Sequence, residues 1–553
     1  MKQLPLLATA LFLLAACDTE SEAPASAPYL INEAAYKESV ATLSSDEFGG
    51  RGPATPGEDK TVEFIAKAFA DAGLKPANNG SYEQQVPLVS IEALGAPMLS
   101  VTGGSEPLAL AYRADQVIWT RREQETIAVA DAELVFVGYG INAPERNWND
   151  YEGVDMTGKI AVILVNDPGF ATGDAKLFNG KAMTYYGRWD YKFDEAARQG
   201  AIGAILIHET APAAYGWVTV DSSWTGAKFG LVREDKGASL SAFESWITTE
   251  SADKLFAAAS LDRRALEAAA LKPGFKAVPM NLAASTEFSN KVDHVTSRNV
   301  AGIVEGSEKP DEYFVYMAHW DHLGTDPSIE GDGIYNGALD NATGTAGLIE
   351  LARAFAGARE KPKRSVLFVA VTAEEQGLLG SAYYAAHPLV PLAKTVAGLN
   401  MDGINNFGRT KDVTVTGYGN SELDGLLAKA AEKQGRVIVP DAHPEHGGFY
   451  RSDHFSLSKR GVPMIYPGSG TDHVERGKAY VAAVEEAFLR DHYHAASDEL
   501  TDDWVFDGAI EDLTLYYHFG RSITDTGIWP AWNEGTEFKA AREASLKGSD
   551  KAQ

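Results

Sequence analysis

The chain has 553 residues, 45% of them hydrophobic, and a formal net charge of −28. This length is too great for one ordinary domain, so we expect two or three. The acidic balance argues against nucleic acid and against an anionic membrane surface as partners, because both attract basic patches.

The first residues predict an export signal. Residues 4–16 (LPLLATALFLLAA) follow a lysine and form an apolar run too short for a usual membrane span. We therefore expect residues 1–16 to be a cleaved signal peptide. The run ends in Leu-Ala-Ala-Cys, which resembles a bacterial lipobox and implies lipidation of Cys17, the only cysteine of the chain. Ordinary cleavage beside an unmodified cysteine is the alternative.

Residues 17–28 (CDTESEAPASAP) are acidic, small and rich in Pro and Ser, which is typical of a flexible tether. The implied location is the bacterial cell envelope or periplasm, with the acyl group at Cys17 as the only membrane contact. The sequence does not predict the oligomeric state.

Two different patterns follow the tether. Residues 33–75 show helical spacing of apolar positions, interrupted by the loop GGRGPATPG, and we assign residues 29–115 to the first part of the main domain. From about residue 130, short β-rich runs (ELVFVGYGI, GKIAVILVNDPG, AIGAILIHE) alternate with the helix-like KFDEAARQG. This pattern predicts a compact inserted α/β domain, which we place at residues 116–285.

From about residue 298, strand, loop and helix patterns alternate. NVAGIVEG, YFVYMAH, RSVLFVAVTA and TVAGLNMDG are typical of strands, and GTAGLIELARAFA of a helix. Such alternation predicts an α/β fold whose mostly parallel sheet is covered by helices on both faces. We assign residues 286–530 to the main part of this domain and residues 531–553 to a charged, polar tail.

Metal-ligating residue types follow three of these strands. His319 and Asp321 follow YFVYMA, Glu374 and Glu375 follow SVLFVAVTA, and Asp402 follows VAGLNM. Ligands of open α/β sheets bind beyond the carboxyl ends of the strands, so these side chains are expected to meet. Each residue alone has an ordinary structural explanation, such as a solvated carboxylate pair or a loop imidazole. Their common placement is what indicates a site.

Five motifs, AHWDHLG, GALDNATGTAG, TAEEQGLLGS, LNMDG and DHYHAASDE, resemble in sequence and order the signature of the co-catalytic zinc aminopeptidases, a family that also contains glutamate carboxypeptidases. The resemblance covers most of residues 29–530 and implies the zinc exopeptidase fold. GYGINAPERNWNDYEGVDMTGKIAVILVNDPG resembles the protease-associated domain inserted in exported members of that family.

The resemblance implies two zinc ions per chain. His319 and Asp402 would bind one ion, Glu375 and His494 the other, and Asp340 would bridge them; imidazole and carboxylate ligands suit zinc.

The resemblance also implies three residues that act beside the metal ligands. The Asp321 carboxylate would accept the other ring N–H of the ligand His319, Glu374 would be the general base, and Tyr493 would hydrogen-bond the oxyanion. The peptide bond after Asp340 is expected to be cis.

FYRSDHFSLSKRGVP resembles the segment that lines the family's substrate pocket. The candidate substrate contacts are Tyr450, Ser452, Asp453 and His454. A polar loop with a helix cap is the alternative explanation of this segment. The remaining histidines near the motifs are expected to support ligands or to face solvent, rather than to bind metal: His322, His443, His446 and His492.

The resemblance therefore implies an exported aminopeptidase that releases N-terminal residues from peptides, with a water activated by two zinc ions and Glu374 as base. A carboxypeptidase or dipeptidase of the same family is the alternative, and Arg451 would contribute to its pocket for a carboxylate. A binding protein that acts through the inserted domain and has a vestigial metal site is a third alternative, disfavoured by the intact ligand set.

Overall fold

The computed structural model of the chain describes Met1 and residues 30–549. The predicted signal peptide, the lipidation of Cys17 and the tether fall on residues outside this description, Met1 apart, and so does the end of the predicted tail. Among the described helices, none combines the length and the apolar character that crossing a bilayer requires.

The main sheet is built around four parallel strands. Its strands are β1 Lys75–Pro76, β2 Glu83–Ala93, β11 Ala227–Leu231, β13 Val278–Val304, β14 Lys309–His319, β17 Arg364–Val371, β18 Thr395–Asn400, β19 Asp412–Thr416, β20 Val437–Pro440 and β21 Met464–Gly468. β17, β14, β18 and β21 pair in parallel in that spatial order. β17 and β18 are buried along their whole length, as expected for parallel strands covered on both faces. Antiparallel pairing adds β13 beside β17 and β19 beside β21.

Helices cover both faces of this sheet. They are α1 Glu33–Leu43, α2 Pro56–Asp71, α9 Thr343–Ala356, α10 Leu379–Ala386, α11 Leu423–Glu432, α12 His454–Ser458, α13 Lys478–Asp491, α14 Asp507–Thr524 and α15 Lys539–Ser549. Alternate residues of β14 point to opposite faces: Phe314 and Tyr316 pack with α1, α2, α9 and α14, whereas Val315 and Met317 pack with α10 and α12. The predicted α/β architecture is confirmed.

A second sheet forms a separate body with its own cores on both faces. Its strands are β3 Leu99–Thr102, β4 Leu108–Leu110, β5 Gln116–Trp119, β6 Thr126–Phe136, β9 Ile160–Leu164, β10 Gly203–Ile207 and β12 Phe243–Ile247. β6, β9, β10 and β12 are parallel neighbours. The helices of this body are α3 Pro168–Thr172, α4 Trp189–Arg198, α5 Thr210–Ala213, α6 Trp217–Ser223, α7 Thr249–Ala258 and α8 Arg263–Ala270.

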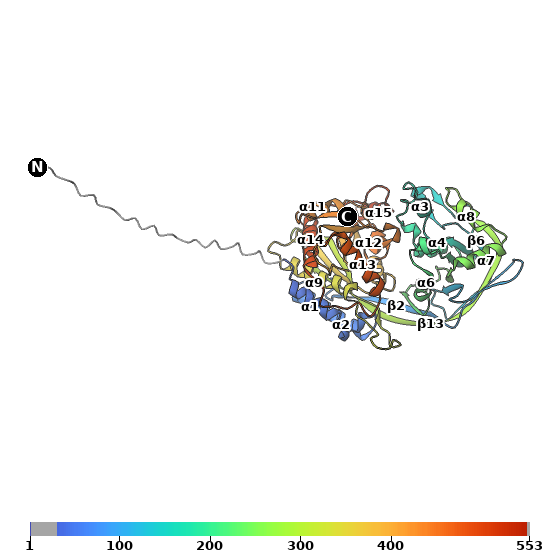
Figure 1. Cartoon of the computed structure of the whole chain (residues 1–553), viewed down its shortest axis with the longest axis horizontal. Helices are drawn as coiled ribbons and strands as arrows, with labels where there is room; N and C mark the ends of the chain where they lie inside the picture. The colour runs from blue at the N-terminus through green and yellow to red at the C-terminus, as the bar shows by residue number, and fades with distance from the viewer. Residues whose placement is uncertain (2–29, 550–553) are drawn as a thin grey trace.

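The 27-residue strand β13 belongs to both sheets. It pairs with β6 up to Ser289 and with β2 from Asn290 onward. β2 and β13 therefore run side by side between the bodies (Figure 1), and β11 pairs with the other edge of β2. β3 and β4 also pair in the second body, although they precede residue 116. The boundaries of the inserted domain stay a prediction.

The described part of the predicted polar tail packs on the main body. The Trp532 indole N–H donates to the Gly461 carbonyl at 2.9 Å, and the Arg542 guanidinium donates to the Thr395 carbonyl at 2.9 Å. Trp532 and Phe538 are 2% and 3% exposed. These apolar and arginine side chains dock a segment whose average composition is polar.

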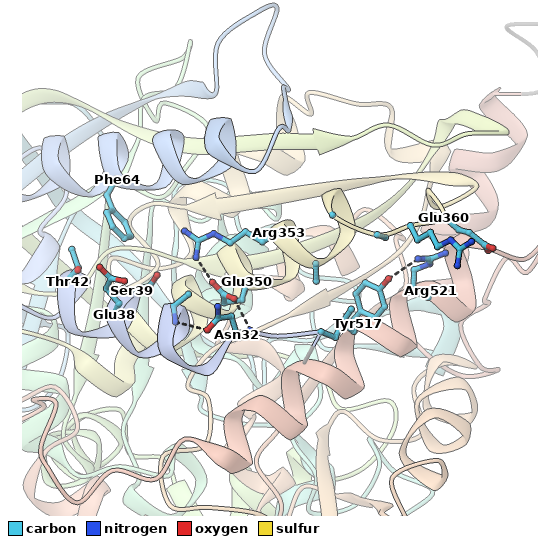
Figure 2. A pocket seen from close by; sticks show the side chains of 16 residues that line it. Asn32, Glu38, Ser39, Thr42, Phe64, Glu350, Arg353, Glu360, Tyr517 and Arg521 are labelled. Carbon is cyan, nitrogen blue, oxygen red and sulfur yellow. Dashed lines mark hydrogen bonds and ion pairs between the residues drawn. The ribbon is translucent and has the colours of Figure 1, made fainter. Parts of the chain in front are cut away.

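Figure 2 shows a hollow of about 970 Å³ between α1, α9 and α14. Its buried Glu350 accepts the backbone N–H of Asn32 at 3.3 Å and pairs with Arg353, and Arg521 donates to the Tyr517 hydroxyl at 2.8 Å. The polar groups of Glu350, Arg353, Tyr517 and Arg521 therefore have hydrogen-bond or ion-pair partners within the chain. The hollow lies at the carboxyl end of α9, whereas Asp340 precedes its amino end, about 20 Å away for a helix of this length.

Candidate metal centre

The predicted ligands reach one edge of the main sheet from separate segments. His319 ends β14, Glu375 lies four residues beyond β17, and Asp402 lies two residues beyond β18. Because β14 lies between β17 and β18 and is parallel to both, these three ends are adjacent. Asp340 comes from the turn Ala338–Ala342 before α9, and His494 from the loop after α13.

The five predicted ligands meet in the expected pairs. The Nε2 atom of His319 lies 3.1 Å from Oδ1 of Asp402, and that of His494 lies 3.0 Å from Oε2 of Glu375. Asp340 lies between the pairs, with Oδ1 3.3 Å from His319 Nε2 and Oδ2 3.4 Å from His494 Nε2. Its two oxygens therefore face two different imidazoles.

The donor atoms suit divalent metal ions. Those of His319, Asp340 and Asp402 lie within 4.8 Å of one another, and so do those of His322, Asp340 and Glu375. Imidazole nitrogens with carboxylate oxygens form a set that zinc binds. Several carboxylates buried together also require compensating positive charge.

Two of the three carboxylates that face the imidazoles, those of Glu375 and Asp340, are held ionised. Burial and the nearby Asp340 raise the pKa of Glu375, but hydrogen bonds from His322 and His494 outweigh them and bring it to about 2. Burial likewise raises the pKa of Asp340, and hydrogen bonds from His319 and His494 bring it well below its usual range. Both groups are thus in the form that binds metal.

Asp321 supports the site differently from the expectation. His319 donates its Nδ1–H to the backbone carbonyl of Asp321 at 3.1 Å, while the carboxylate oxygen lies 3.8 Å from that nitrogen. With Nδ1–H donating to this carbonyl, a deprotonated Nε2 would be the His319 atom available to a metal ion. The carboxylate instead accepts the backbone N–H groups of Glu374 at 3.0 Å and of Glu375 at 3.4 Å. Burial raises the pKa of Asp321 to about 8.

Glu374 lines a cavity of about 320 Å³ beside the ligands. Burial raises the pKa of its carboxyl well above the usual range. Tyr493 and Arg451 line the same cavity, and the Tyr493 ring is stacked on that of His494 at 3.9 Å between centroids. The α13 helix contributes Phe488 and Leu489 to another wall.

Of the four candidate substrate contacts, the structure places only Ser452 in the wall of this cavity. The Tyr450 hydroxyl donates to Glu537 at 2.8 Å, and Asp453 and His454 are fully buried. Tyr450, Asp453 and His454 are thus turned into the main body, which spacing along the sequence did not reveal.

The turn that carries Asp340 is fixed by its neighbours. The peptide bond between Asp340 and Asn341 is cis, as expected. The Asn341 amide accepts the backbone N–H of Gly403 at 3.0 Å and donates to the Met401 carbonyl at 3.0 Å, which ties the turn to the segment with Asp402. Gly337 precedes the turn with φ of 53°, and a Cβ there would lie 2.5 Å from the His322 ring.

Two supporting residues were not predicted as site residues. The buried Arg51 guanidinium donates to the carbonyls of Trp320 at 2.8 Å and Gly337 at 2.8 Å, and so clamps the loop between His319 and Asp340. Burial lowers its pKa to about 10, which leaves it charged at neutral pH.

Asp498 accepts the backbone N–H of Asp340 at 3.1 Å. His322, expected to support a ligand or to face solvent, lies 2.7 Å from Oε1 of the proposed ligand Glu375 through Nδ1.

The comparisons with known proteins agree with the family resemblance of the motifs. Residues 299–518 match the model of peptidase family M28. Aminopeptidase NAALADL1 of Mus musculus is 34% identical over 273 residues, which are 48% of this chain and 31% of that protein. The glutamate carboxypeptidase 2 homolog of Caenorhabditis elegans is 25% identical over 487 residues, 76% of this chain and 57% of that protein. The chain thus spans less than two thirds of either relative.

The aminopeptidase from Aneurinibacillus sp. strain AM-1 has the same fold, with a TM-score of 0.51 and 20% identity over 90% of this chain and 95% of that one. The fold class expected from the motifs is therefore confirmed. The matched segment contains all five motifs. Residues 299–518 therefore resemble peptidase family M28, in line with the resemblance of the motifs to the co-catalytic zinc aminopeptidases.

Proposed function

We propose that the protein is a zinc-dependent aminopeptidase that hydrolyses the N-terminal peptide bond of short peptides. The observation that carries this proposal is the position of Asp340 between two histidine–carboxylate pairs, beside a cavity that Glu374 lines. The family match and the likeness to a mouse aminopeptidase support it. The cavity, at about 320 Å³, has the size of a small-ligand site.

In this proposal His319 and Asp402 would hold one zinc ion, Glu375 and His494 would hold a second, and Asp340 would contribute to both sites. When bound, the ions supply Lewis-acid chemistry that lowers the pKa of a water molecule and polarises the scissile carbonyl. Hydrogen bonds within the chain orient these ligands: His319 donates to the Asp321 carbonyl, and Asp498 accepts the Asp340 N–H.

Glu374 acts as the general base. Its carboxylate accepts a proton from the attacking water and then gives that proton to the leaving amine. Asp321 fixes the backbone at this position by accepting the Glu374 N–H at 3.0 Å. Tyr493 lines the same cavity, and its hydroxyl, which pairs with none of the described residues, donates to the oxyanion of the substrate.

A carboxypeptidase or dipeptidase activity is the second candidate, and Arg451 favours it. The guanidinium lies in the cavity wall over the Tyr215 ring, 5.8 Å from its centroid, and pairs with no carboxylate among the described residues. A free cation of this kind suits the C-terminal carboxylate of a peptide. The worm relative is named as a glutamate carboxypeptidase 2 homolog.

Blocked peptides separate the two activities. A tripeptide amide with a free N-terminus should be cleaved at its first bond, and N-acetylation should abolish that cleavage. A chelator should inactivate the enzyme, and added zinc should restore it. Cleavage of the N-acetylated peptide that is lost on C-terminal amidation would establish the carboxypeptidase instead.

We further propose that the protein is exported and anchored through Cys17, and that the second body is a protease-associated domain. The lipobox-like run and the motif resemblance support these assignments. Expression in a bacterium with labelled palmitate should label the wild-type chain and leave Cys17→Ser unlabelled; equal labelling of both would contradict the anchor.

A further inference from the structure

A second group of metal-ligating side chains lies outside the candidate metal centre. His443, Glu445 and His446 follow β20 and share no residue with that centre. One potential ligand atom of each lies within 4.8 Å of those of the other two. Nothing in the proposed peptidase reaction uses these three side chains.

The spacing of two of these side chains is close to the spacing of ligands around a bound zinc ion. Nδ1 of His443 lies 3.2 Å from Oε1 of Glu445, which matches the edge of about 3.3 Å of a tetrahedron with zinc–ligand bonds of about 2.0 Å. The rings of His443 and His446 are nearly parallel, at 12°, with centroids 5.0 Å apart. The side chains of His443 and Glu445 are 66% and 32% exposed, so water can complete the coordination.

The backbone holds the group on one tight turn. Asp441 accepts the His443 N–H through Oδ1 at 2.8 Å, and the His446 N–H donates to the His443 carbonyl at 2.9 Å. The Pro444 carbonyl accepts the N–H of Met183, in the second body, at 3.1 Å. A turn fixed at several points reduces the ordering cost of binding a ligand.

The loop that carries the group leads into the wall of the candidate active-site cavity. Gly448, two residues after His446, lines that cavity, and so does Arg451. An ion bound at the group would therefore sit on a segment that runs directly into the cavity wall.

We propose that His443, Glu445 and His446 bind one divalent transition-metal ion, separate from the catalytic centre. Two imidazoles and a carboxylate suit Zn²⁺, Ni²⁺ or Cu²⁺ rather than Ca²⁺ or Mg²⁺, which prefer oxygen ligands. An ion bound there restrains the loop that leads into the cavity wall at Gly448. The proposal does not depend on the peptidase function.

The test uses the full chain with its native metal content and Ni²⁺ as the probe. Equilibrium dialysis with metal analysis should show one additional Ni²⁺ per wild-type chain, with the zinc content unchanged. The double variant His443→Ala/His446→Ala should lose this uptake. His294→Ala should keep it, because His294 is an exposed histidine that also pairs with a glutamate, Glu123 at 3.0 Å, but has no second imidazole.

Cu²⁺ electron paramagnetic resonance gives an independent readout, since two coordinating imidazoles produce nitrogen hyperfine structure that the double variant should lack. Glu445→Gln, a smaller change, should weaken Ni²⁺ binding in a chain whose zinc content and basal activity are those of wild type. Equal Ni²⁺ uptake by wild type and the double variant, or no additional uptake by wild type, would overturn the proposal.

Discussion

Asp498 accepts the backbone N–H of Asp340 through Oδ2 at 3.1 Å. The Asp498 carboxylate therefore fixes Asp340, which faces the imidazoles of His319 and His494, although it contacts neither ring itself. Its other oxygen accepts the Leu339 N–H at 3.0 Å. Asp498 is 2% exposed, and it lies only four residues after His494. One short segment therefore carries a proposed ligand and orients another.

Asp498→Ala should loosen the turn around Asp340 and lower metal affinity or activity by about 10-fold to 100-fold, as loss of outer hydrogen bonds does at metal sites. Asp498→Asn keeps one acceptor oxygen and should recover part of the loss. Zinc titration of both variants checks this. Wild-type zinc affinity in Asp498→Ala would show that the hydrogen bonds do not position Asp340.

Arg51→Lys should destabilise the fold by about 2–4 kcal/mol, because an ammonium cannot reproduce a guanidinium that donates to several carbonyls at once. Thermal unfolding with zinc in excess measures the change. Arg359→Lys is the matched control, since Arg359 is an exposed arginine. Equal melting temperatures for the two variants would contradict the role of Arg51 as a clamp.

The sequence predicted the ligands that follow strands. It did not predict Arg51 and Asp498, whose hydrogen bonds fix the backbone around these ligands. His319, Glu375 and Asp402 follow long apolar runs, which locate strand ends without knowledge of tertiary structure. Arg51 could not be found in this way because its partners are backbone carbonyls, and one of them, that of Trp320, lies 269 positions away. Backbone carbonyls leave no pattern in the sequence.

The segment expected to line the substrate pocket shows a second limit of prediction from the sequence. Tyr450, Asp453 and His454 surround Ser452 in the chain, yet only Ser452 lines the cavity. Neighbouring residues of a tightly turning segment point in different directions, so adjacency in sequence does not predict that they line the same cavity. The cis peptide bond and the ligand pairs came from the motif resemblance, which carries tertiary information that composition lacks.

His454 should make stability depend on pH. Burial lowers its pKa from 6.5 to about 3, so below pH 6.5 the unfolded chain binds a proton that the folded chain does not. Stability should therefore fall as the pH drops from 6.5 towards 3, by about 1.4 kcal/mol per pH unit from this group.

Melting temperatures of His454→Gln at several pH values should show a shallower fall than wild type over that range. His387→Gln, at an exposed histidine, should keep the wild-type slope. A slope unchanged by His454→Gln would show that another group controls the acid sensitivity.

Tyr493→Phe should lower kcat by about 10²-fold with little change in KM, because it removes one donor to the oxyanion and leaves the ring stacked on His494. Steady-state kinetics measures both constants. Tyr418→Phe, at a tyrosine that is 50% exposed, is the control. A rise in KM alone would assign Tyr493 to substrate binding.

The general base gives the most direct test of the proposed centre. Glu374→Gln removes the proton acceptor but none of the five proposed ligands, and Gln can keep the backbone contact with Asp321. The decisive measurement is zinc content together with kcat on the same preparation. We predict two zinc ions per chain and a kcat lower by about 10²-fold to 10⁴-fold; two zinc ions with full turnover would contradict the account.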